Sequence, residues 1–279
     1  MLKNTRVLPK DVLDVVKRSR PVYSAARALR FAAGERLGAR PVSGLSGRVH
    51  YNDFMLLSTD PADVDHYVRG ANRFIDIIER SCAEAGRDPA SLRDVLEVGC
   101  GYGRIVRELR KRLPGVQVYV SDVIDAAARF TAAEFSAHKM PTLEHAAPEF
   151  DGRFDLVYLL SVYTHMRREM IAANLRRVAA VLKPGGVVVM TVHGQGSADT
   201  CERYQQYWLD KTRLLQALAR DGYYYERYPY YYDDYGLTWF TRTAFEELVA
   251  ETTPRLTAIA YHALDLDAHQ DVFVYRKDA

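Results

Sequence analysis

An apolar stretch that ends in three alternate glycines constrains this chain more than any other part of its 279 residues. Residues 94–98 are mostly apolar and rich in valine, which predicts a strand buried on both faces of a sheet. Gly99, Gly101 and Gly103 follow. Glycine has no Cβ, so its backbone can turn sharply and approach a ligand closely. A helix beginning near Arg104 would direct its positive N-terminal end at an anionic group, so the stretch predicts a strand, a ligand-binding turn and a helix.

The spacing of these glycines distinguishes between two kinds of cofactor. A dinucleotide-binding turn has the pattern Gly-x-Gly-x-x-Gly, and its third glycine would fall on Arg104. The chain has Glu-x-Gly-x-Gly-x-Gly instead, which resembles motif I of the class I S-adenosylmethionine-dependent methyltransferases. The alternative is a tight turn without a ligand. The resemblance implies S-adenosyl-L-methionine as cofactor, with contacts from Glu97, Gly99, Cys100, Gly101, Tyr102 and Gly103.

The resemblance also implies a fold. We expect an α/β, Rossmann-like sheet of seven strands, mostly parallel, with an antiparallel last strand. Residues 1–60 are expected to form a basic helical N-terminal arm and residues 61–279 the methyltransferase domain. Residues 195–236 interrupt the alternation of strands and helices, so we expect them to form an inserted lid over the substrate.

An acidic residue follows the second predicted strand, residues 116–120. A carboxylate at the end of this strand, about 20 residues after a glycine-rich turn, is placed to bind a ribose diol, because it accepts both hydroxyl protons. Asp122 holds this position. Its alternative role is the N-cap of the next helix, residues 124–137, and we favour ribose binding because the glycine pattern precedes it.

The basic residues are concentrated at the N-terminus. Residues 1–48 hold eleven Lys and Arg against three acids, whereas the net charge of the whole chain is only +2. The apolar residues suggest two short helices separated by Pro21. Such an arm could lie on an anionic membrane, or it could pack on the core or on a second subunit of a homodimer. We favour packing, because the apolar faces are short and rich in alanine.

Candidate substrate and catalytic residues follow the later strands. Residues 140–145 are a weak third strand, after which Glu144, His145 and Ala146 are candidates for adenine contacts. Residues 154–160 form the fourth, and the sequence Phe-Asp-Leu-Val that opens it is typical of motif IV of the same family. Ligands bind outside the carboxyl ends of strands in open α/β sheets. We therefore place three side chains near the transferred methyl group: Ser161 (as a cofactor contact), Tyr163 (as a substrate contact) and His165.

The inserted segment is unusually rich in tyrosine, with seven of the 19 tyrosines within residues 223–232. A tyrosine ring has a flat apolar face and a hydroxyl, which suits stacking on sugars or aromatic rings. Tyr230 and Tyr232 are therefore predicted to contact the substrate. The alternative is that the tyrosines only cover the core. Acids rather than Lys and Arg separate the rings, so the segment does not indicate nucleic-acid binding.

The composition is that of an ordinary globular protein. The small net charge predicts no nucleic-acid partner. Three widely separated cysteines favour a reducing compartment and show no zinc-site spacing. The sequence has no apolar run long enough for a membrane span and no signal-peptide pattern, so we expect a cytoplasmic location.

Methyl transfer to a hydroxyl benefits from a general base, and histidine titrates near neutrality. The candidates, in order of preference, are His165, His193 and His269. The residues around 161–165 and the C-terminal tail resemble bacterial methyltransferases of glycan and secondary-metabolite clusters. We therefore expect O-methylation of a small-molecule hydroxyl on a sugar, glycolipid or secondary metabolite, with no metal. The alternative function is a non-catalytic, cofactor-binding partner protein recruited through its basic arm.

Overall fold

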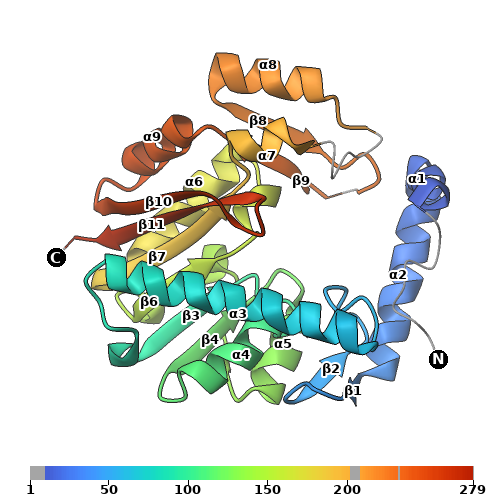
Figure 1. Cartoon of the computed structure of the whole chain (residues 1–279), viewed down its shortest axis with the longest axis horizontal. Coiled ribbons are helices and arrows are strands. Elements are labelled where there is room, and N and C mark those ends of the chain that lie inside the picture. The colour runs from blue at the N-terminus through green and yellow to red at the C-terminus, as the bar shows by residue number, and fades with distance from the viewer. Residues whose placement is uncertain (1–9, 202–207, 232, 279) are drawn as a thin grey trace.

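A seven-stranded sheet lies at the centre of the protein in the computed structural model, which describes residues 10–201, 208–231 and 233–278 (Figure 1). The strand order is β10-β11-β7-β6-β3-β4-β5. Strand β11 is antiparallel to both of its neighbours, and the pairs among the other five adjacent strands are parallel. The expected fold class is therefore confirmed. The strands are β3 (Asp94–Val98), β4 (Gln117–Ser121), β5 (His138–Lys139), β6 (Phe154–Leu159), β7 (Leu182–Val192), β10 (Leu256–Leu266) and β11 (Gln270–Lys277).

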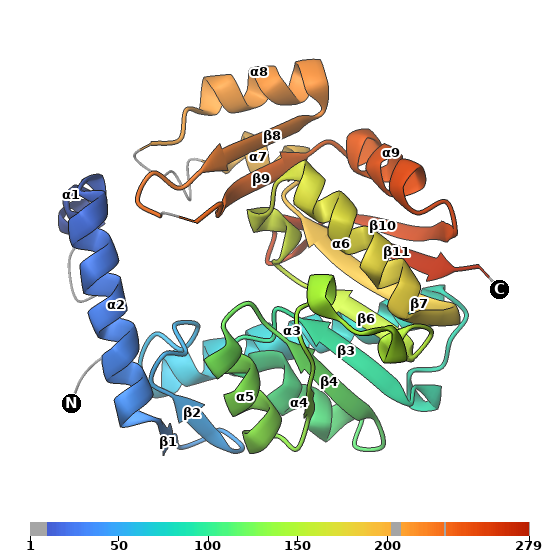
Figure 2. The same cartoon turned by 180° about the vertical axis from the view of Figure 1, so that it is seen from behind.

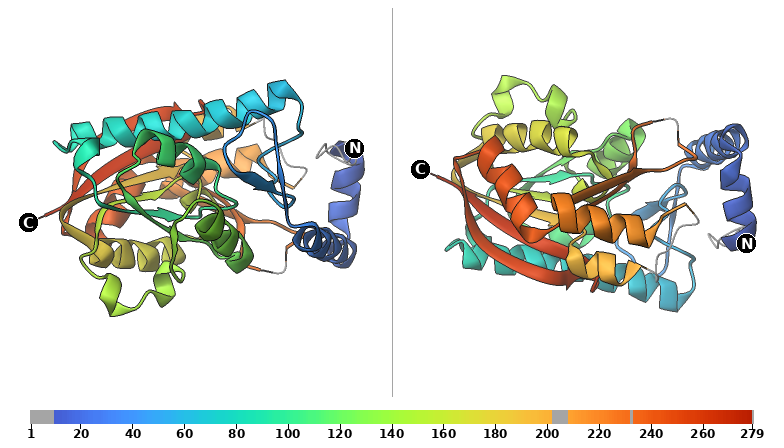
Figure 3. Two further views of the ribbon diagram at one scale, coloured as in Figure 1. Left: turned by 90° about the horizontal axis from the view of Figure 1, so that it is seen from below. Right: turned by 90° about the horizontal axis from the view of Figure 1, so that it is seen from above.

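Helices cover both faces of this sheet, because side chains along each central strand alternate between two cores. Val95 of β3 lies in the core beneath one group of helices, and Leu96 lies in the core on the opposite face. Figure 3 shows the sheet between these two layers. The first layer comprises α3 (Pro61–Glu84), α4 (Arg104–Arg112) and α5 (Asp125–Glu134), and the second comprises α6 (Arg168–Val181) and α9 (Arg242–Thr252).

The third strand differs from the prediction. Residues 140–145 are not a strand, because β5 ends at Lys139 and residues 143–145 form a 3-10 turn. Pro141 follows directly, and proline has no N–H with which to continue a strand pairing. Glu144 and His145 are exposed on this turn. The fifth predicted strand, residues 187–192, begins five residues earlier in the structure, at Leu182.

The inserted segment folds as a small helix-and-hairpin unit above the sheet (Figure 2). Strands β8 and β9 pair antiparallel, and a small core joins the hairpin to α8 through Leu214, Tyr224 and Trp239. The unit extends past residue 236, because an isolated bridge joins Trp239 to His193 at the end of β7. Its elements are α7 (Gln195–Asp199), α8 (Lys211–Asp221), β8 (Tyr223–Arg227) and β9 (Gly236–Phe240).

The N-terminal arm consists of two helices and a short hairpin: α1 (Lys10–Arg18), α2 (Arg20–Leu37), β1 (Ala39–Pro41) and β2 (Arg48–His50). Pro21 lies in the first turn of α2, where its missing N–H would have no helical partner. The C-terminal half of α2 is fastened to the domain, because the Asn52 amide donates to the carbonyl of Phe31 and to Glu35, each at 3.0 Å. Among the described residues, no helix is long and apolar enough to cross a bilayer.

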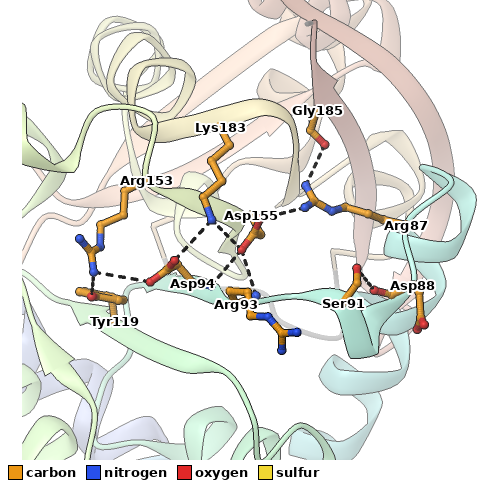
Figure 4. A network of polar contacts seen from close by, with 10 residues as sticks. All are labelled: Arg87, Asp88, Ser91, Arg93, Asp94, Tyr119, Arg153, Asp155, Lys183 and Gly185. Atoms are coloured by element: carbon orange, nitrogen blue, oxygen red, sulfur yellow. Dashed lines mark hydrogen bonds and ion pairs between the residues drawn. The ribbon is translucent and has the colours of Figure 1, made fainter.

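A buried carboxylate ties together several elements at the amino end of β6 (Figure 4). Asp155 accepts hydrogen bonds from the backbone N–H groups of Arg93 and Asp94, both at 2.9 Å. It also forms ion pairs with Arg87 at 2.8 Å and Lys183 at 2.9 Å. Burial raises the pKa of Asp155, but these donors outweigh it and the pKa lies below its usual value. Asp155 therefore has a structural role at the end of the sheet opposite to the glycine turn.

We predict that Asp155→Asn lowers the free energy of unfolding by about 2 kcal/mol at pH 7, because it removes the charge that Arg87 and Lys183 face. The loss should shrink as the pH falls below 3.8 and through the lower pKa of the folded state, where the wild-type carboxyl is also neutral. Urea unfolding at pH 7 and pH 3 measures both effects. Asp151→Asn, which breaks only the half-exposed pair with Arg177, is the matched control and should change stability by less than about 1 kcal/mol. Equal losses in the two variants would contradict the prediction.

Candidate active site

The glycine turn between β3 and α4 requires glycine at each of its three positions for backbone reasons. Gly99, Gly101 and Gly103 have φ values of 79°, 50° and 84°, in the left-handed region that other residues rarely adopt. A Cβ on Gly99 would lie 2.6 Å from the Val162 side chain, and one on Gly103 would lie 2.4 Å from Phe135. A Cβ on Gly101 would have no heavy atom within 4 Å. The backbone at Gly101 therefore borders open space that a ligand could enter.

The carboxylate of Asp122 holds this turn against the end of β4. One oxygen accepts from the backbone N–H of Gly101 and the other from that of Ile124, each at 2.8 Å. Asp122 is not the N-cap of α5, because Ile124 holds that position. Burial raises the pKa of Asp122 and the two N–H donors lower it, with a net rise. Each oxygen keeps a lone pair that can accept a hydroxyl proton.

These features fit the cofactor that the sequence pattern implies. The turn offers a backbone that a ligand can approach at Gly101, and Asp122 beside it offers acceptor oxygens for two ribose hydroxyls. The residues that would hold S-adenosyl-L-methionine are therefore the turn from Gly99 to Gly103 and Asp122.

The other predicted cofactor residues support the turn with buried side chains. Glu97 is 2% exposed and accepts a hydrogen bond from the Tyr158 hydroxyl at 3.0 Å. Burial raises the pKa of Glu97 to about 8, although the Tyr158 hydrogen bond lowers it. The Cys100 side chain belongs to the core, and the Tyr102 ring stacks on His50 with a centroid distance of 4.4 Å. Only the backbone of Cys100 and Tyr102 lies along the turn, so a role for their side chains in cofactor binding is not supported.

The end of β6 carries a strained residue in a polar network. Ser161 has φ 59°, and its N–H donates to the Thr191 hydroxyl at 2.8 Å. The Gln270 amide donates to the Ser161 hydroxyl at 2.9 Å, and its oxygen accepts from Thr191 at 2.6 Å. Non-glycine residues in this conformation concentrate at functional sites. Sequence reasoning did not identify Gln270 or Thr191, because the chain pairing that brings them to Ser161 spans 109 residues.

The predicted substrate residues have different positions. Tyr163 is fully buried, and its hydroxyl donates to Asn174 at 2.9 Å within the core. The substrate contact predicted for Tyr163 is therefore wrong, because its ring fills the space between β6 and α6. Tyr230 lines a cavity of the inserted unit and packs on Tyr23 of α2 with ring centroids 4.8 Å apart. Tyr232 lies outside the described residues.

The three predicted histidines gather near the carboxyl ends of β6 and β7. The ring centroids of His193 and His269 are 4.7 Å apart, and His165 is close enough to His193 to lower its pKa electrostatically. Burial is the main cause by which the pKa of each of the three histidines lies below its usual value. All three are therefore neutral at pH 7.

Strand β9 of the inserted unit selects the tautomer of two of these histidines. Nδ1 of His165 lies 2.8 Å from the carbonyl oxygen of Gly236, and Nδ1 of His193 lies 3.0 Å from that of Thr238. A carbonyl oxygen only accepts hydrogen bonds, so each Nδ1 carries the hydrogen and each Nε2 has a free lone pair. His165 also stacks on Tyr235 with centroids 4.7 Å apart. Both rings are thus prepared to take a proton.

A cavity of about 290 Å³ lies between α2 and the tyrosine-rich part of the inserted unit. One wall comes from α2, and Ile124, two residues after Asp122, lines it as well. The arm therefore contributes directly to the site, which nothing in its sequence indicates. The aromatic residues of its lining are Tyr23, Phe31, Tyr230 and Tyr231, and its charged residues are Arg27 and Asp233.

Within residues 10–201, 208–231 and 233–278, no three His, Cys, Asp or Glu side chains converge as they would around a metal ion. Asp271, one of the acids that the sequence offered, is instead buried and accepts from the Tyr261 hydroxyl at 2.7 Å and from the Leu264 N–H at 2.9 Å.

Comparisons with known proteins agree with this geometry. Residues 96–188 match a family model described as a methyltransferase domain. A tRNA N(3)-cytidine methyltransferase of Danio rerio is 27% identical over 112 residues, which are 36% of this chain and 32% of the relative. The ubiquinone biosynthesis O-methyltransferase of Bradyrhizobium sp. is 30% identical over 128 residues, which are 43% of this chain and 49% of the relative. The alignments thus span between a third and a half of these relatives.

A solved structure shares the fold. The S-adenosylmethionine-dependent methyltransferase from Clostridium acetobutylicum superposes with a TM-score of 0.52 at 12% sequence identity, over 76% of this chain and 92% of that protein. At this identity the likeness concerns the fold alone.

We predict that Glu97→Gln stabilises the protein relative to wild type as the pH rises from 4.5 to about 8. The folded state favours the neutral carboxyl, so above pH 4.5 the wild type takes up a proton on folding, a cost that the amide avoids. The difference in the free energy of unfolding should reach about 3 kcal/mol near pH 7 and vanish below pH 4.5. Urea unfolding across this pH range measures it. The exposed Glu144→Gln is the control, and parallel wild-type and Glu97→Gln curves would refute the prediction.

Proposed function

This chain carries a class I S-adenosylmethionine-dependent methyltransferase domain, and we propose that it methylates a hydroxyl group of a small, ring-bearing acceptor. The observation that carries the proposal is the histidine cluster. His165 and His193 are neutral, and backbone carbonyls of β9 leave their Nε2 atoms free to act as bases. A hydroxyl must lose its proton as it becomes an ether, so it gains from such a base.

The cofactor supplies an activated methyl group on a sulfonium, which is already a strong electrophile. The protein therefore has to orient the acceptor and remove its proton. We assign proton removal to His165, because it is less buried than His193 and lies among the tyrosines of the inserted unit. His193 and His269 lie beside it, and the positive charge that each would carry if protonated disfavours a further proton on the cluster.

The cavity between α2 and the inserted unit supports the choice of acceptor. Its volume of about 290 Å³ is close to the lower end of small-molecule sites. The rings of Tyr23, Tyr230 and Tyr231 offer flat apolar faces for a sugar or an aromatic ring. Arg27 gives the same cavity a cationic group.

We expect Asp122→Asn to weaken S-adenosylhomocysteine binding at least tenfold, because an amide presents only one acceptor oxygen to the ribose and opposes an N–H group to the Gly101 or Ile124 N–H. Isothermal titration calorimetry of the full chain measures the affinity. The exposed Asp125→Asn, three residues further on, is the control and should bind like wild type. Unchanged affinity in Asp122→Asn would exclude the ribose assignment.

For catalysis, His165→Ala should lower transfer of labelled methyl groups to a panel of sugar and aromatic alcohols at least about a hundredfold, with S-adenosylhomocysteine affinity changed less than about twofold. The acid limb of the wild-type rate should have its midpoint below pH 6.5, because burial lowers the pKa of His165 and the neutral ring is the base. His262→Ala, on the far edge strand β10, is the control.

Normal turnover in His165→Ala would reject the base assignment. Tight cofactor binding by the wild type without transfer to any acceptor class would instead favour the non-catalytic partner protein.

A further inference from the structure

The outward side of helix α2 carries an apolar stripe that the fold leaves exposed. Val22, Ala26, Leu29, Ala33 and Leu37 recur at intervals of three or four residues, which places them on one side of a helix. All five are exposed, and Leu29 retains 73% of its accessible surface. An amphipathic helix normally turns such a stripe to the core.

The orientation of α2 is determined by its opposite side, so the exposure of the stripe is built into the fold. Gly34 fits so closely against the Asn52 amide that a Cβ there would lie 1.8 Å from its oxygen. Tyr23 packs on Tyr230, and the Arg27 guanidinium lies 4.7 Å from the Tyr231 ring centroid. Figures 1 and 2 show α2 along the outer edge of the molecule.

A second element extends the apolar surface. The loop after β2 exposes Phe54, Met55 and Leu57, which retain 44%, 58% and 50% of their accessible surface. The guanidinium of Arg30 on α2 lies 4.3 Å from the Phe54 ring centroid and so joins this loop to the helix. We call the combination of the five stripe residues and these three loop residues the arm surface.

The charge beside the arm surface selects its partner. Arg30 and Arg36 flank the stripe on α2, and residues 12–48 hold eight basic against two acidic residues, a net charge of +6. A second copy of the chain would meet this surface through the same residues, so two stripes packed antiparallel would bring like charges together. An anionic lipid surface offers an apolar interior and negative headgroups at once. We propose that the arm surface binds anionic lipid bilayers peripherally, with the stripe and loop side chains in the headgroup region.

Co-flotation of the full chain with vesicles tests this without cofactor or acceptor, so its outcome is independent of the proposed methyl transfer. The probes are vesicles of phosphatidylcholine alone and of phosphatidylcholine with 30% phosphatidylglycerol. We expect binding to the anionic vesicles and little to the neutral ones, with a decrease in 0.5 M NaCl. Val22→Ser/Leu29→Ser and Arg30→Gln/Arg36→Gln should each lower the partition coefficient at least tenfold.

Matched controls lie elsewhere on the surface. Val123→Ser removes an apolar side chain that is 87% exposed, and Arg213→Gln/Arg220→Gln removes two exposed charges on α8. Both should float like wild type, and circular dichroism should show each variant folded. Absence of wild-type flotation, or equal flotation of the serine variant, would overturn the proposal. So would a concentration-dependent dimer that the serine variant abolishes, or tRNA binding that depends on Arg30 and Arg36 but not on the stripe.

Discussion

The site depends on two backbone N–H groups that share one carboxylate. Asp122 lies at the end of β4, and β4 pairs in parallel with β3, so the carboxylate reaches the Gly101 N–H of the turn that follows β3. The backbone N–H groups of Gly99 and Cys100 meanwhile donate to the carbonyl of Ser121. The turn is thereby held in a left-handed conformation that only glycine adopts readily. Strand pairing, turn geometry and the acceptor oxygens for a ribose are consequences of one arrangement.

The inserted unit acts on the chemistry through its backbone as well as through its tyrosines. Strand β9 presents the carbonyls of Gly236 and Thr238 to His165 and His193, which assigns both protons to Nδ1. Burial under the same unit lowers the pKa of both rings. A segment that covers a site from water can therefore also prepare its bases, because desolvation favours the neutral imidazole and a fixed acceptor selects its tautomer.

Helix α2 has two functional sides in this arrangement. Tyr23 and Arg27 line the cavity, while Leu29 on the outward side belongs to the arm surface. The link to the cofactor turn is direct, because the Tyr102 hydroxyl donates to Glu35 of α2 at 3.2 Å. Displacement of the arm would therefore be felt both at the cavity and at the turn.

The sequence by itself determined the sheet, the glycine turn and Asp122, because these depend on local signals: buried apolar runs, residues that require a particular φ, and an acid at a strand end. It also identified the histidines as candidates from their positions after strands. Only the tertiary structure decided which side chains face the site. Tyr163 follows β6 as His165 does, yet its ring turns into the core, because side-chain direction in a short turn depends on what packs there. Gln270 reaches Ser161, and α2 reaches the inserted unit, through contacts between distant segments that no local pattern encodes.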